Sequence, residues 1–337
     1  MNAKVAINGM GRIGRALLKL ALHKPSVDLV AINDLVDVED LAYLLRFDTV
    51  YGRYPTPVTT DGGELVVAGR TLRTLRQRDP SELPWKDLDV DLVFECTGAH
   101  TGRADLEKHL RAGARFVLLS APSKDDGVGT VIHGVNAPDG APAIISCASC
   151  TTNCITPIVE VIGRRIGLRK AAMTTVHAYT SSQSLVDGPN KRFRRGRSAA
   201  ANLVPATTGA ARATTRALPE YAGRFDGVAI RAPIPVGSIA DITFVTSRTT
   251  TADEVNQVLT EEAGTQRYRG VLGVSHDPLV SSDVIGDPRA SIVDLELTKV
   301  IDGDLVKVMS WYDNEYGYAN QMLREALSVL RPENPNP

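Results

Sequence analysis

Cys150 and His177 are the two residues of this 337-residue chain whose types and surroundings fit covalent chemistry. Cys150 stands just ahead of the apolar run 155–162, and the hydroxyl of Ser149 marks the start of a helix there. A thiol in the first turn of a helix feels unpaired N–H groups and the positive end of the helix dipole, which predicts a lowered pKa. The strand-like segment 171–180 supplies His177, a candidate base for this thiol. The pair predicts nucleophilic catalysis.

The other cysteines are Cys96, Cys147 and Cys154, and Cys147 forms a C-x-x-C pair with Cys150. Such a pair also occurs in zinc sites and in dithiol redox centres. No second C-x-x-C and no His-x-x-x-His accompanies it, and redox motifs of this kind usually open a shorter thioredoxin-like domain. We therefore interpret Cys150 as a nucleophile and expect no metal. A disulfide between Cys147 and Cys150 would switch the nucleophile off.

A glycine-rich turn near the amino terminus predicts a dinucleotide site. Residues 4–8 are typical of a strand, and residues 9–15 carry G-x-G-x-x-G ahead of a helical run. In this motif Gly9 permits the tight turn, Gly11 lets the backbone approach a pyrophosphate, and Gly14 lets helix and strand pack closely. The phosphates then lie at the helix amino terminus, where N–H groups point toward them.

Asp34 indicates which dinucleotide is bound. A second strand, residues 27–33, ends at Asp34, at the distance from the glycine turn expected of the carboxylate that binds the adenosine ribose. This carboxylate would repel the 2′-phosphate of NADP and accept hydrogen bonds from the free hydroxyls of NAD. The alternative interpretation makes Asp34 a turn residue. The sequence favours NAD.

The pattern of elements changes at about residue 150. Before it, buried strands at 91–96 and 116–120 flank a helix at 103–111, which is typical of a doubly wound parallel sheet. After it, longer strands rich in Thr, Val and Ile favour a mixed or antiparallel sheet. The length also favours two domains. We expect an α/β chain with a Rossmann-type NAD-binding domain at 1–149, completed by a carboxy-terminal helix at about 316–331, and an α+β catalytic domain at 150–315.

Composition narrows the possible partners. The formal net charge is −1, hydrophobic residues make up 43% and charged residues 23%, which gives no general attraction to nucleic acid or to an anionic membrane. With no signal-like or membrane-spanning segment, we expect a cytoplasmic protein with no membrane partner. The basic segment 191–197 has three interpretations: a solvated loop, a nucleic-acid patch that uses Phe193, or a site for an anionic substrate. We expect no nucleic-acid partner.

Five motifs resemble, in order, those of one enzyme family, the phosphorylating, NAD-dependent glyceraldehyde-3-phosphate dehydrogenases. The motifs are residues 7–15, 148–154, 174–180, 208–211 and 310–315. The resemblance implies oxidative phosphorylation of D-glyceraldehyde 3-phosphate to 1,3-bisphosphoglycerate with NAD and inorganic phosphate. The reaction would pass through a thiohemiacetal and a thioester on Cys150, with His177 as base. The resemblance also implies a homotetramer.

The same resemblance assigns binding residues. Those for the substrate phosphate and for inorganic phosphate are Ser149, Thr151, Thr180, Arg195, Thr208, Gly209 and Arg231. Those for the cofactor, beside the three glycines, are Arg12, Ile13, Asp34, Arg78, Ser120 and Asn314. Guanidinium groups and hydroxyls are suited to phosphate oxygens.

The nearest alternative within the resemblance is erythrose-4-phosphate dehydrogenase, which uses water as the acceptor. Thr180 and the run 208–211 favour the triose phosphate. An alternative of another class is a nucleic-acid-binding protein that acts through residues 191–197. The chain departs from the family pattern at Cys147, where asparagine is usual, and at residues 181–182, where two serines replace Asn-Asp.

Overall fold

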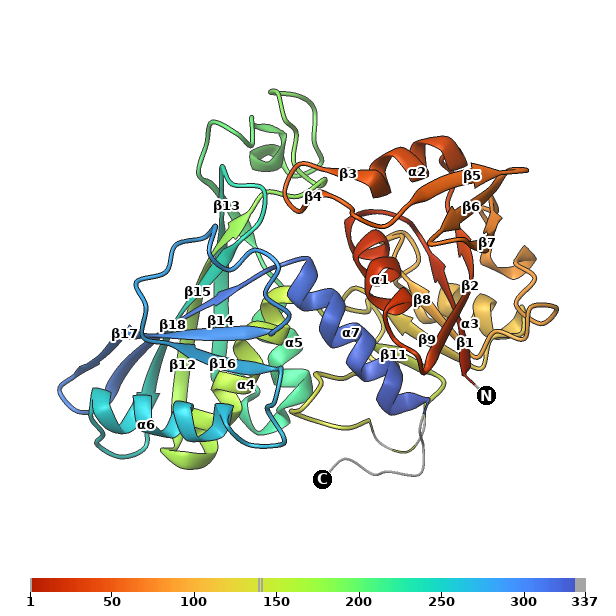
Figure 1. Ribbon diagram of the computed structural model, residues 1–337. Coiled ribbons are helices and arrows are strands. Elements are labelled where there is room, and N and C mark those ends of the chain that lie inside the picture. Colours follow the sequence, from red (N-terminus) through yellow and green to blue (C-terminus); the bar gives the residue numbers. More distant parts are fainter. Residues whose placement is uncertain (1, 139, 141, 331–337) are drawn as a thin grey trace. The chain divides into compact units, whose positions relative to one another are not determined.

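The computed structural model describes residues 2–138, 140 and 142–330, which divide into two compact units (Figure 1). Each unit has its own sheet and is described by itself. The first unit takes its described residues from Met1–Val131, Ala137–Ala148 and Met322–Pro337, and the second from Ile132–Asn136 and Ser149–Gln321.

The first unit is built on a nine-stranded sheet in the order β10-β11-β9-β8-β1-β2-β7-β6-β5. The strands from β10 to β7 run parallel, and β7, β6 and β5 form antiparallel pairs at one edge. The strands are β1 (Ala3–Asn8), β2 (Val27–Asn33), β5 (Val58–Asp61), β6 (Glu64–Val67), β7 (Arg70–Leu75), β8 (Leu92–Glu95), β9 (Phe116–Leu119), β10 (Gly129–Thr130) and β11 (Ile144–Ser146). The remaining elements are α1 (Arg12–Leu22), α2 (Val38–Arg46), the ribbon β3 (Phe47–Asp48) and β4 (Gly52–Arg53), the short helix η1 (Pro80–Glu82) and α3 (Arg103–Arg111).

A buried carboxylate ties together the strand ends of this unit. Glu95, at the end of β8, is fully buried, and its Oε2 accepts a hydrogen bond from Asn8 Nδ2 at 2.6 Å. Its Oε1 accepts from the backbone N–H of Thr97 at 2.8 Å. Trp85 Nε1 donates to His109 Nδ1 at 3.0 Å, so His109 carries its own proton on Nε2, 3.1 Å from Glu95 Oε2. Because β1 ends at Asn8, these bonds hold the ends of two neighbouring strands directly before the glycine turn.

The second unit contains a seven-stranded mixed sheet in the order β13-β14-β12-β15-β18-β17-β16. Two pairs, β12 with β14 and β16 with β17, are parallel, and the other pairs are antiparallel. The strands are β12 (Leu168–Ala178), β13 (Val204–Thr207), β14 (Phe225–Ala232), β15 (Ser238–Thr246), β16 (Leu272–Ser275), β17 (Ser291–Ile301) and β18 (Leu305–Tyr312). The helices are α4 (Cys150–Arg165), η2 (Phe193–Gly196), α5 (Ala210–Ala217), η3 (Pro219–Tyr221) and α6 (Ala252–Ala263), followed by α7 (Tyr316–Val329), which continues into the first unit.

Helix α4 is the central element of the second unit. It packs against α5, α6 and the sheet (Figure 1), and every residue from 151 to 162 is buried. A helix that is buried on all sides needs small and apolar side chains around its whole circumference. At Gly163 a β-carbon would lie 1.9 Å from the hydroxyl of Tyr221, so glycine is required there. The chemistry-bearing first turn of α4 is therefore fixed by the core itself.

The predicted fold class is confirmed: a Rossmann-type parallel sheet precedes a unit with a mixed sheet. Observed bounds differ from the predicted ones by a few residues, as at β12, which spans residues 168–178 where 171–180 is predicted. The antiparallel extension through β5 and β6 was not predicted, because short, partly exposed strands lack the long apolar runs of a parallel sheet. Within the described part of the chain, no helix combines the length and apolar character needed to cross a membrane.

We predict that Glu95→Ala destabilises the first unit by about 3 kcal/mol, because it leaves buried donors on Asn8 and His109 unpaired. The measurement is the midpoint of the first unfolding transition by calorimetry. Glu107→Ala is the matched control, since Glu107 pairs with Arg103 across one turn of the exposed face of α3, and its loss is expected to cost about 0.5 kcal/mol or less. Equal effects of the two variants would contradict a structural role for the buried carboxylate.

Candidate active site

The structure brings the predicted thiol and imidazole into contact. Cys150 is the first residue of α4, and His177 lies near the end of β12. The distance from Cys150 Sγ to His177 Nε2 is 3.3 Å. Ser149 caps α4 by accepting a hydrogen bond from the backbone N–H of Thr152 at 3.2 Å. The first turn of a buried helix thus presents a thiol directly to a candidate base.

Arg231 is placed beside this pair by strand register. In the parallel pair β12 and β14, His177 stands opposite Arg231. Arg231 Nη1 lies 2.7 Å from His177 Nδ1 and donates to the carbonyl of Ala178 at 3.0 Å. His177 Nδ1 also lies 2.7 Å from the same carbonyl, which can only accept, whereas the guanidinium of Arg231 can only donate, so the two neighbours of Nδ1 favour opposite tautomers. Nε2 of the ring faces the thiol.

Burial keeps both partners neutral. Burial, followed by the charges of Arg231 and Arg195, lowers the pKa of His177 to about 3, against the opposing effect of the bond to Ala178. Burial also raises the pKa of Cys150, although Arg231 and the amide and hydroxyl of Thr151 act in the opposite direction. The sequence-based expectation of a lowered thiol pKa is therefore wrong, because desolvation of this partly buried thiolate outweighs the helix terminus.

A second group of polar side chains lies next to this pair. Thr180 Oγ1 and Ser182 Oγ are 2.8 Å apart, and Arg195 Nη1 donates to Ser182 Oγ at 2.5 Å. Burial, followed by the positive charges of Arg231 and Arg192, lowers the pKa of Arg195. The guanidinium groups of Arg195 and Arg231 are therefore close enough to repel each other. Two arginines and adjacent hydroxyls form an arrangement that favours a bound anion.

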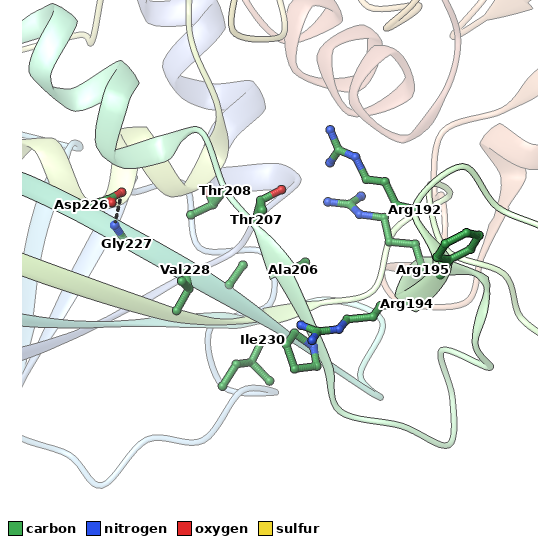
Figure 2. A pocket seen from close by; sticks show the side chains of 13 residues that line it. Arg192, Arg194, Arg195, Ala206, Thr207, Thr208, Asp226, Gly227, Val228 and Ile230 are labelled. Atoms are coloured by element: carbon green, nitrogen blue, oxygen red, sulfur yellow. Dashed lines mark hydrogen bonds between the residues drawn. The ribbon is translucent and has the colours of Figure 1, made fainter.

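Arg195 also lines a surface pocket together with Thr208. The pocket is formed by residues 192–195, 205–208 and 226–230, and Figure 2 shows Arg194 leaving its segment in a different direction from Arg192 and Arg195. Thr208 Oγ1 accepts a hydrogen bond from the backbone N–H of Ala210 at 3.1 Å, and Gly209 precedes the first turn of α5. The segment 191–197, with its basic side chains, therefore forms part of a pocket wall in the second unit.

The glycine turn of the first unit fits a dinucleotide phosphate. Gly9 has φ +97°, and a β-carbon there would lie 2.6 Å from the backbone nitrogen of Thr97. At Gly14 a β-carbon would lie 2.0 Å from the carbonyl oxygen of Gly9. A β-carbon at Gly11 would instead point into open space, ahead of a helix whose amino terminus has no side-chain cap. This space, lined by N–H groups, suits a pyrophosphate.

Asp34 follows β2 and lies next to the glycine turn. Its Oδ2 accepts a hydrogen bond from the backbone N–H of Met10 at 2.6 Å, and its Oδ1 accepts from the backbone N–H of Val36 at 3.1 Å. The carboxylate is thus held at the carboxyl edge of the parallel sheet, where dinucleotide-binding folds place the ribose. The position fits the predicted contact with NAD.

The other predicted cofactor residues are found in both units. Arg12 and Ile13 open α1, and Arg12 Nη1 donates to Asp48 Oδ2 at 2.5 Å. Ser120 follows β9 and Arg78 follows β7, so both lie at the carboxyl edge of the sheet in the first unit. Asn314 belongs to the second unit, where its Oδ1 accepts from the backbone N–H of Gly237 at 3.2 Å and from the hydroxyl of Ser238 at 2.9 Å.

The remaining cysteines, like Cys150, form no disulfide within the described part of the chain. Cys147 and Cys154 are buried. Burial and the Glu325 carboxylate raise the pKa of Cys147 well above its usual value. Among the described residues, no group of three or more His, Cys, Asp or Glu side chains has the arrangement of a metal site. The regulatory disulfide between Cys147 and Cys150 stays a prediction.

Sequence analysis missed two residues next to the reacting pair. The ring of Tyr312 packs edge-on against His177, with centroids 5.9 Å apart, and Ser182 contacts both Thr180 and Arg195. Tyr312 lies in the motif 310–315, but its motif gave no sign that the hydroxyl is buried near Cys150. Only the order of the sheet, in which β15 separates β12 from β18, could have shown it.

Comparisons with known proteins match most of this chain. The family model described as glyceraldehyde 3-phosphate dehydrogenase, NAD binding domain, matches residues 3–103, and the C-terminal domain model of the same family matches residues 149–314. The chain is 45% identical over 335 residues to the glyceraldehyde-3-phosphate dehydrogenase of Zymomonas mobilis, covering 98% of this chain and 99% of that protein. It is 45% identical over 334 residues to glyceraldehyde-3-phosphate dehydrogenase 1 of Bacillus subtilis, with the same coverage. It is 46% identical over 332 residues to the Mycobacterium bovis glyceraldehyde-3-phosphate dehydrogenase, covering 96% and 97%.

The neutral thiol and imidazole predict how alkylation of Cys150 depends on pH. Because burial raises the pKa of Cys150, the thiolate fraction is small at neutral pH and increases as the pH rises. His177, with a pKa of about 3, stays neutral over this range. Iodoacetamide labelling is expected to accelerate steadily from about pH 6 to about pH 9. High and constant reactivity below about pH 7 would instead indicate a thiolate–imidazolium pair.

His177→Asn is expected to slow this labelling, because the amide cannot take the thiol proton as the sulfur attacks. The Cys150→Ser variant identifies the labelled residue, since the other thiols of the protein remain in it. An unchanged labelling rate in His177→Asn would remove the imidazole from thiol activation.

Proposed function

The chain belongs to the glyceraldehyde 3-phosphate dehydrogenase family, and we propose that Cys150 and His177 carry out the oxidation of D-glyceraldehyde 3-phosphate. The reaction consumes NAD and inorganic phosphate and yields 1,3-bisphosphoglycerate. The observation that supports these residue roles is the distance of 3.3 Å between Cys150 Sγ and His177 Nε2. A thiol and an unprotonated imidazole in contact are the parts that addition to an aldehyde requires.

The first half of the proposed reaction forms a bond to sulfur. Cys150 Sγ attacks the aldehyde carbon while His177 Nε2 takes the thiol proton and returns a proton to the new oxygen, which gives a thiohemiacetal. NAD, when bound, accepts the hydride from that carbon. His177 Nε2 removes the hydroxyl proton as the carbon is oxidised, and a thioester remains on Cys150.

The second half releases the product. An oxygen of inorganic phosphate attacks the thioester carbon, the bond to sulfur breaks, and the departing sulfur of Cys150 takes the proton held by His177. Thr180 and Arg231 are proposed to hold the phosphate of the substrate. Inorganic phosphate, or both anions along a path that they share, is proposed to be bound by Ser149, Thr151, Arg195, Thr208 and Gly209. A bound anion would offset the two guanidinium charges that lower the pKa of His177, and so make its proton exchange easier near neutral pH.

NAD binding is assigned to the first unit. The open space before Gly11 and the uncapped start of α1 suit the pyrophosphate, and Asp34 suits the adenosine ribose. Arg12, Ile13, Arg78 and Ser120 are proposed to complete this surface. Asn314, whose amide oxygen is held by two donors, is proposed to recognise the nicotinamide amide with its NH2 group.

A cytoplasmic homotetramer is also proposed. In the second unit, Phe193 is 90% exposed and Leu203 is 67% exposed, and Leu185 and Val186 in the same stretch are exposed as well. Exposed apolar side chains gathered in one stretch are typical of a surface that another protein chain covers. Sedimentation of the purified protein at several concentrations measures the assembly, and a monomer throughout would contradict it.

The function is tested by assaying reduction of NAD and NADP with glyceraldehyde 3-phosphate, with and without inorganic phosphate. We expect turnover that depends on NAD and on phosphate. Cys150→Ser should lose turnover while it still binds NAD, because an alkoxide is far less available than a thiolate. Erythrose 4-phosphate is the alternative substrate, and its oxidation without any need for phosphate would favour the relative that uses water.

Asp34 determines the choice of cofactor in this proposal. Asp34→Gly should relax the preference for NAD over NADP, because it removes the carboxylate that repels the 2′-phosphate. The measurement is the ratio of kcat/KM for the two cofactors, with Asp37→Gly as a control that removes a nearby exposed carboxylate. An unaltered ratio in Asp34→Gly would mean that Asp34 serves only as a turn residue.

A further inference from the structure

Three buried hydroxyls form a connected chain behind Cys150. Tyr312 Oη lies 2.8 Å from Thr151 Oγ1 and 2.8 Å from Thr175 Oγ1. Thr175 Oγ1 in turn donates to the backbone carbonyl of Ile239 at 3.1 Å. The exposed fractions of Thr151, Thr175 and Tyr312 are 4%, 0% and 1%. They come from α4, β12 and β18, so tertiary packing alone assembles them.

The carbonyl of Ile239 determines which hydroxyl donates in each hydrogen bond of this chain of hydroxyls. Each hydroxyl has one proton, and a carbonyl can only accept. When Thr175 donates to Ile239, the bond between Thr175 and Tyr312 must use the proton of Tyr312. The bond between Tyr312 and Thr151 must then use the proton of Thr151. In this direction the Thr151 proton points away from its neighbour Cys150.

The opposite direction delivers a proton donor to the reacting sulfur. If Thr175 turns its proton toward Tyr312, Tyr312 donates to Thr151, and Thr151 is free to donate to an anion at Cys150. No proton moves from one oxygen to another, since each O–H bond only rotates. The Thr151 hydroxyl lies close enough to Cys150 to stabilise its thiolate form, and so to lower the pKa of Cys150 against the larger effect of burial. The ionisable groups around Cys150 are His177, Arg231, Tyr312 and Cys154.

We propose that Thr175 and Tyr312 are positioning residues that turn the Thr151 hydroxyl away from the resting thiol and, by reversing, let it donate to the thiolate and to the oxyanions that follow. The inference rests on the proposed role of Cys150. The ring of Tyr312 packs against His177, but the hydroxyls of Thr175 and Tyr312 act on Cys150 through Thr151. Chains of hydroxyls polarise one another, so the reversed chain makes Thr151 a stronger donor than an isolated hydroxyl.

Thr175→Val tests the direction of the chain. Valine keeps the shape of the buried side chain but removes the hydroxyl that links Tyr312 to the carbonyl of Ile239. Tyr312 can then donate only to Thr151, and Thr151 is free to face Cys150. Iodoacetamide labelling at neutral pH, without substrate or NAD, is expected to accelerate about tenfold, with its pH midpoint moved to lower pH. Slower or unchanged labelling would overturn the proposal.

Two further variants separate this role from a structural one. Thr151→Val is expected to slow labelling, and the double variant Thr151→Val/Thr175→Val should label as slowly as Thr151→Val alone, because the gain requires the Thr151 hydroxyl. Thr214→Val is the matched control: Thr214 is fully buried, and its hydroxyl pairs with Thr156 of α4 at 2.9 Å, away from Cys150. Faster labelling that persists in the double variant, or that appears in Thr214→Val, would mean that loosened packing exposes the thiol. Either result would overturn the proposed chain of hydroxyls.

These outcomes are independent of the proposed function. Labelling reports on the thiol in the free protein, so an inactive enzyme that still shows the gain in Thr175→Val would contradict the assigned reaction and leave the hydroxyl chain standing. An active enzyme whose Thr175→Val variant labels no faster would support the assigned reaction and contradict the proposed chain of hydroxyls.

Discussion

Burial of Cys150 against His177 is the constraint on which the chemistry of this protein depends. A partly buried sulfur in contact with a buried imidazole cannot ionise freely, because a charge on either group loses hydration. The pair therefore rests as a neutral acid and a neutral base, ready to exchange a proton when a carbonyl carbon arrives. The surrounding groups, Arg231, Arg195 and Thr151, decide how easily negative charge develops on the sulfur and on the atoms bound to it.

Strand register and helix burial hold this pair in place. His177 and Arg231 stand opposite each other because β12 and β14 run parallel, and the first turn of α4 is fixed because the whole helix is enclosed. In the first unit, the buried carboxylate of Glu95 performs the corresponding task. It binds Asn8 and Thr97 on either side of the space that Gly9 occupies, so the glycine turn begins from fixed strand ends. In both units, polar groups inside the core position the residues at its edge.

Local sequence patterns predicted most of the elements and most of the residues near the site. The helix at 103–111 and the strand at 27–33 match the structure, because each carries a clear periodicity with a defined start and end. The glycine turn was recognised because a nucleotide phosphate needs close approach of the backbone, which only glycine permits. The pKa of Cys150 was predicted wrongly, since the sequence shows the start of a helix but not how far the tertiary structure desolvates the thiol there.

The sequence by itself determined the fold class and the family, because those follow from periodicity and from residue types at fixed spacing. It also predicted Cys150 as the nucleophile. Only the tertiary structure decided the ionisation state of Cys150 and His177 and the direction of the hydroxyls behind them. These depend on Arg231, Tyr312 and the carbonyl of Ile239, which come from different strands. The free energy of a buried charge or hydrogen bond is set by such neighbours in space, and no spacing along the chain encodes it.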